Sequence, residues 1–291
     1  MIFGGGPQTA LEEAPVVVLP IPYGATLTYR AGAAEGPAAL LAASAQMELY
    51  DDELAEEIID RGIHTLPMVE PNLAAPEAMM EEIRQAALPH VRAGRFLTAI
   101  GGDHSITVGL LRAYIDHFGD DFSVLQLDAH ADLRASYHGT PFSHACVMHQ
   151  VARMGLPAVQ VGIRSLSREE GRLIRERDWG GRIFWARDIV PMAQRQDDAW
   201  MAAAIDQLKS SVYVTLDLDA LDPAVMPAVG TPEPGGLDYW TVIRLLRRVV
   251  ESRRVIGFDI NELSPIPGQP AGEFTAARIL YKMIGYRLRA T

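Results

Sequence analysis

The residues most suited to chemistry form a short acidic and histidine cluster after an apolar run. The run 122–127 leads into Asp128, His130 and Asp132, which are separated by one residue each. Because alternate residues of an extended chain point to the same side, these three side chains could converge on one ion. Carboxylates are seldom buried unless they are paired or bound to a metal. The spacing therefore predicts a metal site at the end of this predicted strand.

Two other apolar runs end in residues of the same kind. The run 212–216 leads into Asp217 and Asp219, and the run 96–100 leads into His104. Each cluster alone could be a turn or a helix cap, but all three follow predicted strands. Together they supply two imidazoles and four carboxylates, enough for two divalent ions that share bridging carboxylates. The predicted ligands are His104, Asp128, His130, Asp132, Asp217 and Asp219.

Predicted strands and helices alternate along the chain without an evident linker. The strands are expected at 16–19, 96–100, 122–127, 158–162, 183–186, 212–216 and 255–258. The helices are expected from Gly36 and from Ser167, and over 76–93, 106–117, 144–154, 197–208, 239–250 and 273–286. This alternation predicts an α/β fold: a single-domain, three-layer α/β/α arrangement over residues 1–291, with a mostly parallel sheet of about eight strands. In such sheets ligands bind beyond the carboxyl ends of the strands, where every candidate ligand lies.

The composition fits a large enzyme better than a nucleic-acid or membrane protein. The chain has 291 residues, is 48% hydrophobic and carries a formal net charge of -11, which disfavours nucleic acid and anionic membranes as partners. Cys146 is the only cysteine, which excludes an intramolecular disulfide and favours a reducing compartment. Because no signal-peptide pattern and no long apolar run occurs, we expect a cytoplasmic protein.

Three motifs occur in the order and spacing of a known enzyme family. The segments GGDHS, DAHAD and TLDLDALDP resemble those of the ureohydrolases, which include arginases, agmatinases, guanidinobutyrases and formiminoglutamases. The resemblance extends over nearly the whole chain, and it implies two Mn²⁺ ions and a homo-oligomer, a trimer or hexamer. It also implies the division of the ligands: His104 and Asp132 for one ion, His130 and Asp219 for the other, with Asp128 and Asp217 as bridges.

The same resemblance implies hydrolysis of a small cationic guanidino substrate to urea and an amine. Glu262, which follows the predicted strand 255–258, would bind the guanidinium through two parallel hydrogen bonds. Asp132 would pass a proton to the leaving amine, and His144 would contact the substrate region and exchange protons with solvent. His138 competes with His144 for this role, but the loop length after Asp132 and the Ser-His start of the next helix favour His144.

The tail of the substrate is expected to be cationic. Arginases hold the amino-acid end of arginine with an Asn where this chain has Arg134, which would repel an α-amino group. The surrounding pattern resembles agmatinases, so agmatine, cleaved to putrescine and urea, is the expected substrate. Gly24 stands where many agmatinases carry an acid, and Arg134 with His138 could pair with a carboxylate. Guanidinobutyrate or another guanidino or formimino acid therefore stays open.

Two readings from other classes are disfavoured. A non-catalytic, metal-binding regulator on the same scaffold would be expected to lack a ligand or Glu262, and all of these are present. A deacetylase-type amidohydrolase would need only one zinc, whereas both ligand sets are complete here.

Overall fold

The computed structural model describes residues 1–177 and 179–290; Asp178 and Thr291, the last residue of the predicted domain, lie outside the described residues. One sheet of eight strands forms its centre, in the order β4-β1-β5-β10-β9-β6-β7-β8, and every neighbouring pair is parallel. The strands are β1 (Val16–Ile21), β4 (Ile63–Thr65), β5 (Phe96–Gly101), β6 (Ser123–Leu127), β7 (Ala158–Ile163), β8 (Ile183–Trp185), β9 (Ser211–Asp217) and β10 (Arg254–Asn261). A two-residue antiparallel pair, β2 (Tyr50–Asp51) and β3 (Glu56–Glu57), lies apart from this sheet.

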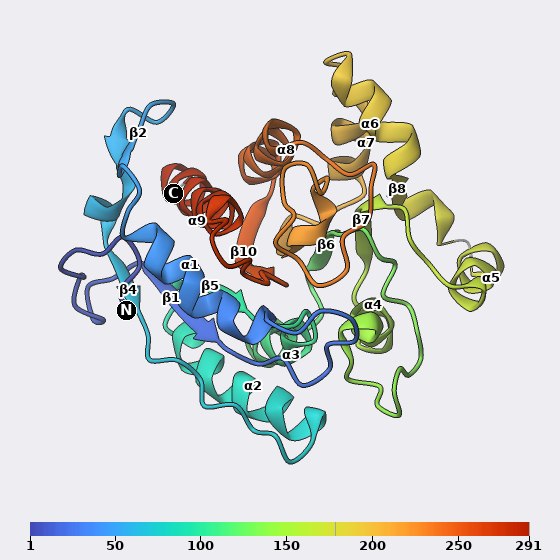
Figure 1. Ribbon diagram of the computed structural model, residues 1–291, viewed down its shortest axis with the longest axis horizontal. Helices are drawn as coiled ribbons and strands as arrows, with labels where there is room; N and C mark the ends of the chain where they lie inside the picture. Colours follow the sequence, from blue (N-terminus) through green and yellow to red (C-terminus); the bar gives the residue numbers. More distant parts are fainter. Residues whose placement is uncertain (178, 291) are drawn as a thin grey trace.

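Helices cover both faces of the sheet (Figure 1). They are α1 (Gly36–Ser44), α2 (Pro76–Arg92), α3 (Ile106–Phe118), α4 (Val147–Arg153), α5 (Arg168–Glu176), α6 (Ala186–Gln194), α7 (Ala199–Asp206), α8 (Tyr239–Ser252) and α9 (Ala271–Arg289). In β1, Val16 and Val18 pack into the core formed with α1, α8 and α9, whereas Val17 and Leu19 pack into the core formed with α2 and α3. The alternation along one strand fills two separate cores, so the predicted three-layer fold with a parallel sheet is confirmed.

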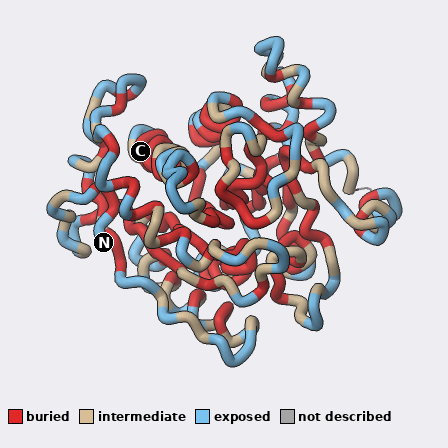
Figure 2. The backbone as a smooth tube through the Cα atoms, in the orientation of Figure 1, coloured by how far each residue is buried: buried red, intermediate tan, exposed pale blue. Residues whose placement is uncertain are grey.

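Burial explains why the strands could be predicted. β1, β5, β6 and β7 are buried along their entire length, because helices cover both of their faces. Such strands read as continuous apolar runs rather than as alternating ones. Figure 2 shows the same result, with the buried backbone concentrated in the strands and in the helix sides that face them.

Two helices differ from the sequence-based expectation. The predicted helix 144–154 begins as a 3-10 turn at His144–Cys146 and becomes α-helical only at Val147. The helix α6 was not expected, since Pro191 lies inside it. By contrast, α5 begins as predicted after Ser167, whose hydroxyl accepts a hydrogen bond from the amide of Glu170 in a capping box. Among the described residues, no helix has the length and apolarity needed to cross a membrane.

Candidate metal centre

The candidate site lies at the carboxyl ends of four neighbouring strands in the middle of the sheet. Asp128 directly follows β6, Asp217 is the last residue of β9, and Glu262 directly follows β10. His104 follows β5 after a tight turn at Gly102, where a side chain would place its Cβ 1.9 Å from the carbonyl oxygen of Tyr23. Because these four strands are adjacent in the order β5-β10-β9-β6, their ends bring together segments that are far apart in the sequence.

The first group of possible metal ligands is centred on His104. Its Nδ1 atom lies 3.1 Å from Oδ2 of Asp128 and 3.1 Å from Oδ2 of Asp132. Oδ2 of Asp217 is 3.5 Å from the same nitrogen. All four residues are buried, and His104, Asp128 and Asp132 offer ligand atoms close enough for one ion.

The second group is centred on His130. Its Nδ1 atom lies 2.9 Å from Oδ2 of Asp219 and 3.7 Å from Oδ1 of Asp128. Asp128, His130 and Asp219 again offer ligand atoms close enough for one ion. Asp128 belongs to both groups, which is the position that a bridging ligand must have. The structure thus brings all six predicted ligands into one site.

Asp132 lies with the other candidate ligands, as expected, but the strand alternation from which this was predicted does not extend to it. The chain stays extended past β6 only as far as an isolated bridge between His130 and Ser165. At Asp132 the backbone turns into the left-handed region, with φ of 52°. This conformation is uncommon for a residue with a side chain and costs about 1–3 kcal/mol. The turn, rather than a strand alternation, directs the Asp132 carboxylate toward His104.

Hydrogen bonds on the far side of His104 fix its protonation. The hydroxyl of Thr215 donates to Oδ1 of the buried Asp259 at 2.6 Å, which uses its single proton. Nε2 of His104, 2.8 Å from Thr215 Oγ1, must therefore donate in that contact. In the neutral ring that metal coordination requires, Nδ1 then carries the lone pair; it faces the three carboxylates, buried and without a hydrogen-bond partner among the described residues. A lone pair and carboxylates that face one another in a dry site call for a cation between them.

The charges of the cluster lead to the same requirement. Burial lowers the pKa of His130, but the carboxylates of Asp219 and Asp128 together outweigh it and raise that pKa to about 12. Burial together with the charge of Asp128 raises the pKa of Asp132 well above its usual range. Burial and the charges of Asp219 and Asp128 do the same to the pKa of Asp217. Each shift reports uncompensated negative charge, so the residues present fit a pair of divalent cations.

Glu262 lies beside the first group of ligands. It is buried, and its Oε1 atom accepts a hydrogen bond from the amide of His104 at 2.8 Å. Burial and then the charge of Asp103 raise the pKa of Glu262 well above its usual range. Its backbone also adopts a left-handed conformation, with φ of 67°, as at Asp132. Its surroundings disfavour the ionised form of this buried carboxyl group, and a cationic partner would favour that form again.

His144 and His138 occupy different places. His144 lines a cavity of about 240 Å³ whose wall also includes His130, Asp132 and Thr231. Burial is the main reason that the pKa of His144 is lowered. His138 stacks edge-on against Tyr137, with ring centroids 4.4 Å apart, and among the described residues it does not line this cavity. Of the two histidines, His144 is the one placed near the metal cluster.

Sequence reasoning missed the residues that hold His144. The hydroxyl of Thr26 donates to Oδ2 of the buried Asp103 at 3.0 Å and accepts the backbone amide hydrogen of His144 at 3.0 Å. Its proton is thereby used, so Nδ1 of His144, 3.2 Å from the same oxygen, must donate to it. Nε2 is then the unprotonated nitrogen. Thr26 lies in a loop with no ligand-type spacing, so no sequence signal pointed to it.

Arg134 lines the same cavity and has partners of its own. Its guanidinium carbon lies 4.7 Å from the centroid of the Tyr137 ring, and its Nε is 3.9 Å from Oε2 of Glu170. Gly24 packs against Ala34 and Leu27, where an added Cβ would lie 3.0 Å from the Cβ of Ala34. An acidic side chain at Gly24 would therefore need its neighbours to move.

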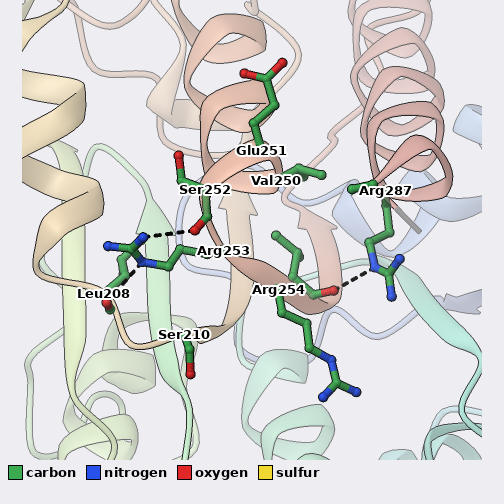
Figure 3. A pocket seen from close by; sticks show the side chains of 10 residues that line it. Leu208, Ser210, Val250, Glu251, Ser252, Arg253, Arg254 and Arg287 are labelled. Atoms are coloured by element: carbon green, nitrogen blue, oxygen red, sulfur yellow. Dashed lines mark hydrogen bonds between the residues drawn. The ribbon is translucent and has the colours of Figure 1, made fainter.

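A larger cavity, of about 650 Å³, lies at the opposite end of β9 and β10 (Figure 3). Arg253 there donates to the carbonyl oxygens of Leu208 and Ser252, and Arg287 donates to that of Val255. These guanidinium groups tie the last turns of α8 and α9 to the sheet. Neither of the two possible metal-ligand groups of the described residues lies at this cavity.

The fold and the site together define a metal-dependent hydrolase built on a parallel sheet. The family model described as Arginase matches residues 14–285, so the chain belongs to the arginase family, and it is a ureohydrolase of agmatinase type.

The chain is similar to the N(1)-aminopropylagmatine ureohydrolase of Synechocystis sp., with 41% identity covering 98% of this chain and 95% of the relative. It is 42% identical to the enzyme of the same name from Thermus thermophilus, covering 97% and 94% of the two chains. The solved structure of the agmatine ureohydrolase of Thermoplasma volcanium matches with a TM-score of 0.85 and 31% identity, covering 96% and 92%.

Proposed function

We propose that this enzyme removes urea from a guanidine whose tail is a cationic amine. N(1)-aminopropylagmatine is the substrate that we favour, and agmatine, the substrate expected from the sequence, is the second. The observation that carries this proposal is that Arg134, the guanidinium in the cavity wall that could pair with an anionic tail, already lies over Tyr137 and near Glu170. The names of the relatives from Synechocystis sp. and Thermus thermophilus support the longer of the two amines.

We propose that the metal ions are two manganese ions, held by the six residues of the two groups. When bound, they would supply the nucleophile by lowering the pKa of a water molecule from about 15.7 toward neutrality. His104 and His130 would each coordinate through Nδ1, the nitrogen that faces the carboxylates. Thr215 holds the opposite nitrogen of His104 and so fixes the ring for this task.

Glu262 would bind and orient the guanidinium group. One of its oxygens already accepts the amide hydrogen of His104, so the guanidinium is fixed relative to a metal ligand. Two parallel hydrogen bonds to the carboxylate would turn the guanidinium carbon toward the cluster.

Asp132 and His144 would handle the protons of the reaction. Asp132 lies in the cavity wall and would pass a proton to the leaving amine. His144 would exchange other protons between the site and solvent through Nε2, which the hydrogen bond from Nδ1 to Thr26 leaves unprotonated. The products would be urea and spermidine from aminopropylagmatine, or urea and putrescine from agmatine.

The test is urea release from manganese-loaded enzyme with four guanidines. N(1)-aminopropylagmatine should have the highest kcat/KM, followed by agmatine, with arginine and 4-guanidinobutyrate at least about a hundredfold lower, because an unpaired buried carboxylate costs several kcal/mol. If 4-guanidinobutyrate were the best substrate, the proposed tail class would be wrong. Release of no urea from any of the four would favour the metal-binding regulator.

We also propose that the enzyme is a cytoplasmic homo-oligomer of three or six chains. The family resemblance and the single cysteine support this proposal. Light scattering of the purified protein would give the mass, and a mass of one chain of 31.8 kDa would contradict it.

A further inference from the structure

Glu233 lies at the edge of the active-site cavity and has no role in the mechanism above. Its Oε1 atom accepts a hydrogen bond from the hydroxyl of Ser165 at 2.9 Å and lies 3.8 Å from Nε2 of His130. Ser165 and His130 both line the cavity. The Glu233 side chain keeps 38% of its surface exposed, so its carboxylate borders the cavity and also reaches solvent.

The backbone fixes where this carboxylate can be. Arg164 donates to the carbonyl oxygen of Glu233 through Nη2 at 2.7 Å and through Nε at 3.2 Å. The same Nη2 atom donates to the carbonyl oxygen of the candidate ligand Asp219 at 2.7 Å. Pro232 and Pro234 flank Glu233. Each proline fixes its own φ angle, and Pro234 also restricts the backbone of Glu233 before it. The position of Glu233 is therefore tied to that of the metal cluster.

Glu170, the acid in the cavity wall outside the cluster, already has a hydrogen-bond donor on each oxygen. Glu170 accepts the amide hydrogen of Leu133 at 2.9 Å on one oxygen and that of Ser167 at 2.7 Å on the other. Glu233, in contrast, has Oε2 left over: no donor from residues 1–177 or 179–290 reaches it. Glu233 is thus the carboxylate at this cavity that can still accept a cation.

The loop that carries Glu233 begins beside the proposed guanidinium acceptor. A Cβ built on Gly230 would lie 3.6 Å from Oε2 of Glu262, and Thr231, the next residue in the chain, lines the cavity. Three residues of chain span at most about 10 Å, which limits the separation of Gly230 and Glu233. Four methylenes with an amine at each end extend about 6 Å, a length of the same order, since each bond is about 1.5 Å long.

We propose that Glu233 binds the ammonium group that lies four carbons from the guanidinium, and so selects cationic tails. This inference rests on the proposed function. The group would be the primary amine of agmatine or the secondary amine of aminopropylagmatine, whose extra aminopropyl arm would continue into solvent. 4-Guanidinobutyrate would instead place a carboxylate near Glu233, and arginine would add a carboxylate beside its ammonium group; two like charges repel.

The test compares agmatine with n-butylguanidine, which has the same four carbons but no tail amine. In Glu233→Gln, kcat/KM for agmatine should fall about tenfold or more through KM, because an ionic hydrogen bond is lost. The value for n-butylguanidine should stay within about twofold. Glu169→Gln, which removes the same charge from an exposed position on α5, should change neither value.

A binding measurement tests the inference without turnover. Calorimetry of manganese-loaded protein should show 1,4-diaminobutane bound about tenfold more weakly by Glu233→Gln, and n-butylamine bound equally by both proteins. An equal loss for both guanidines, with reduced metal content, would mean that Glu233 only positions His130, and would overturn the inference. No loss for agmatine would also overturn it. The proposed function is tested separately, because it depends on the substrate order of the wild-type enzyme.

Discussion

The backbone amide of His104 donates a hydrogen bond to Oε1 of Glu262 across 2.8 Å. This contact joins a candidate metal ligand at the end of β5 to the proposed guanidinium acceptor at the end of β10. The amide of Glu262 in turn donates to the carbonyl oxygen of Gly102 at 2.8 Å. The two strand ends are therefore held in register by a pair of hydrogen bonds, which sets the distance between substrate and metals before either is bound.

The first prediction concerns the charge of Glu262. Glu262→Gln keeps an oxygen that can accept the His104 amide hydrogen but removes the negative charge that pairs with the guanidinium. We expect kcat/KM to fall by a hundredfold or more, since the loss of a charged partner in a buried pair costs about 3 kcal/mol. Metal content, measured by atomic absorption, should be unchanged. A variant that loses its metal together with its activity would assign Glu262 to the metal site instead.

The second prediction separates shared from single ligands. Asp128 belongs to both groups of possible ligands, whereas Asp219 belongs to one. Asp128→Asn should therefore weaken the binding of both metal ions, and Asp219→Asn should weaken mainly the binding of one. Manganese titration with calorimetry would count the sites, and chelation of the wild type should abolish urea release. Two intact sites in Asp128→Asn would contradict the assignment.

The third prediction concerns the hydrogen bonds that hold His144. Thr26→Val retains the shape of the side chain but removes the hydroxyl that fixes the tautomer. We expect kcat to fall about tenfold to a hundredfold with little change in metal content, because general acid–base steps contribute on this scale. Thr26→Ser should restore most of the activity. Equal activity in Thr26→Val and the wild type would show that the tautomer is not needed.

The pH dependence of activity should follow from the lowered pKa of His144. Burial is the main cause of its pKa lying below the usual 6.5, so Nε2 is unprotonated throughout the neutral range. Activity should fall on acidification below 6.5, as this nitrogen takes up a proton. His144→Asn should have lower activity, and its pH profile should lack this fall on acidification. Metal content measured at each pH identifies any acid loss that comes from ligand protonation.

The fifth prediction concerns stability far from the site. Lys282 of α9 is buried and contacts Oδ1 of Asp51 at 2.8 Å and Oε2 of Glu53 at 2.9 Å. Lys282→Met fills the same space but leaves the buried Asp51 without its cation. We expect the free energy of unfolding to fall by about 3 kcal/mol. Lys209→Met, which removes an exposed ion pair with Asp121, should change it by less than about 1 kcal/mol.

The same network predicts how stability changes with pH. Burial raises the pKa of Glu53, but hydrogen bonds from Tyr286 and Lys282 outweigh burial and keep this pKa below its usual 4.5 in the folded protein. Its contribution is therefore present above 4.5 and is lost as pH falls through the folded value. Urea denaturation of metal-free protein from neutral to acid pH should show a smaller acid loss in Lys282→Met. Parallel pH curves for the two proteins would contradict this role.

The sequence carried enough information for the sheet and for the set of ligands. Parallel strands buried on both faces read as apolar runs, and their carboxyl ends must lie at one edge, so Asp128 and Asp217 could be placed together in advance. The strand β4 escaped prediction, because its three residues form no apolar run, and it lies at the edge of the sheet.

The supporting residues could not be predicted in the same way. Thr26 meets Asp103 across 77 positions and His144 across 118, and nothing in a loop sequence reports such a contact. Glu233 lies between two prolines and reads as a surface turn. Tertiary packing, rather than local pattern, decides which of the many polar loop residues face the site.

The strand order also determines when this protein can complete its core during synthesis. β10 is the last strand made, yet it lies between β5 and β9 in the middle of the sheet. A chain that ends before residue 254 would therefore present two apolar strands with unpaired edges facing each other. Such edges pair readily with other chains, so shortened or still-growing chains should be the aggregation-prone species. When β10 pairs with β5 and β9, both edges are covered. The same step brings Glu262, the residue after β10, to the site.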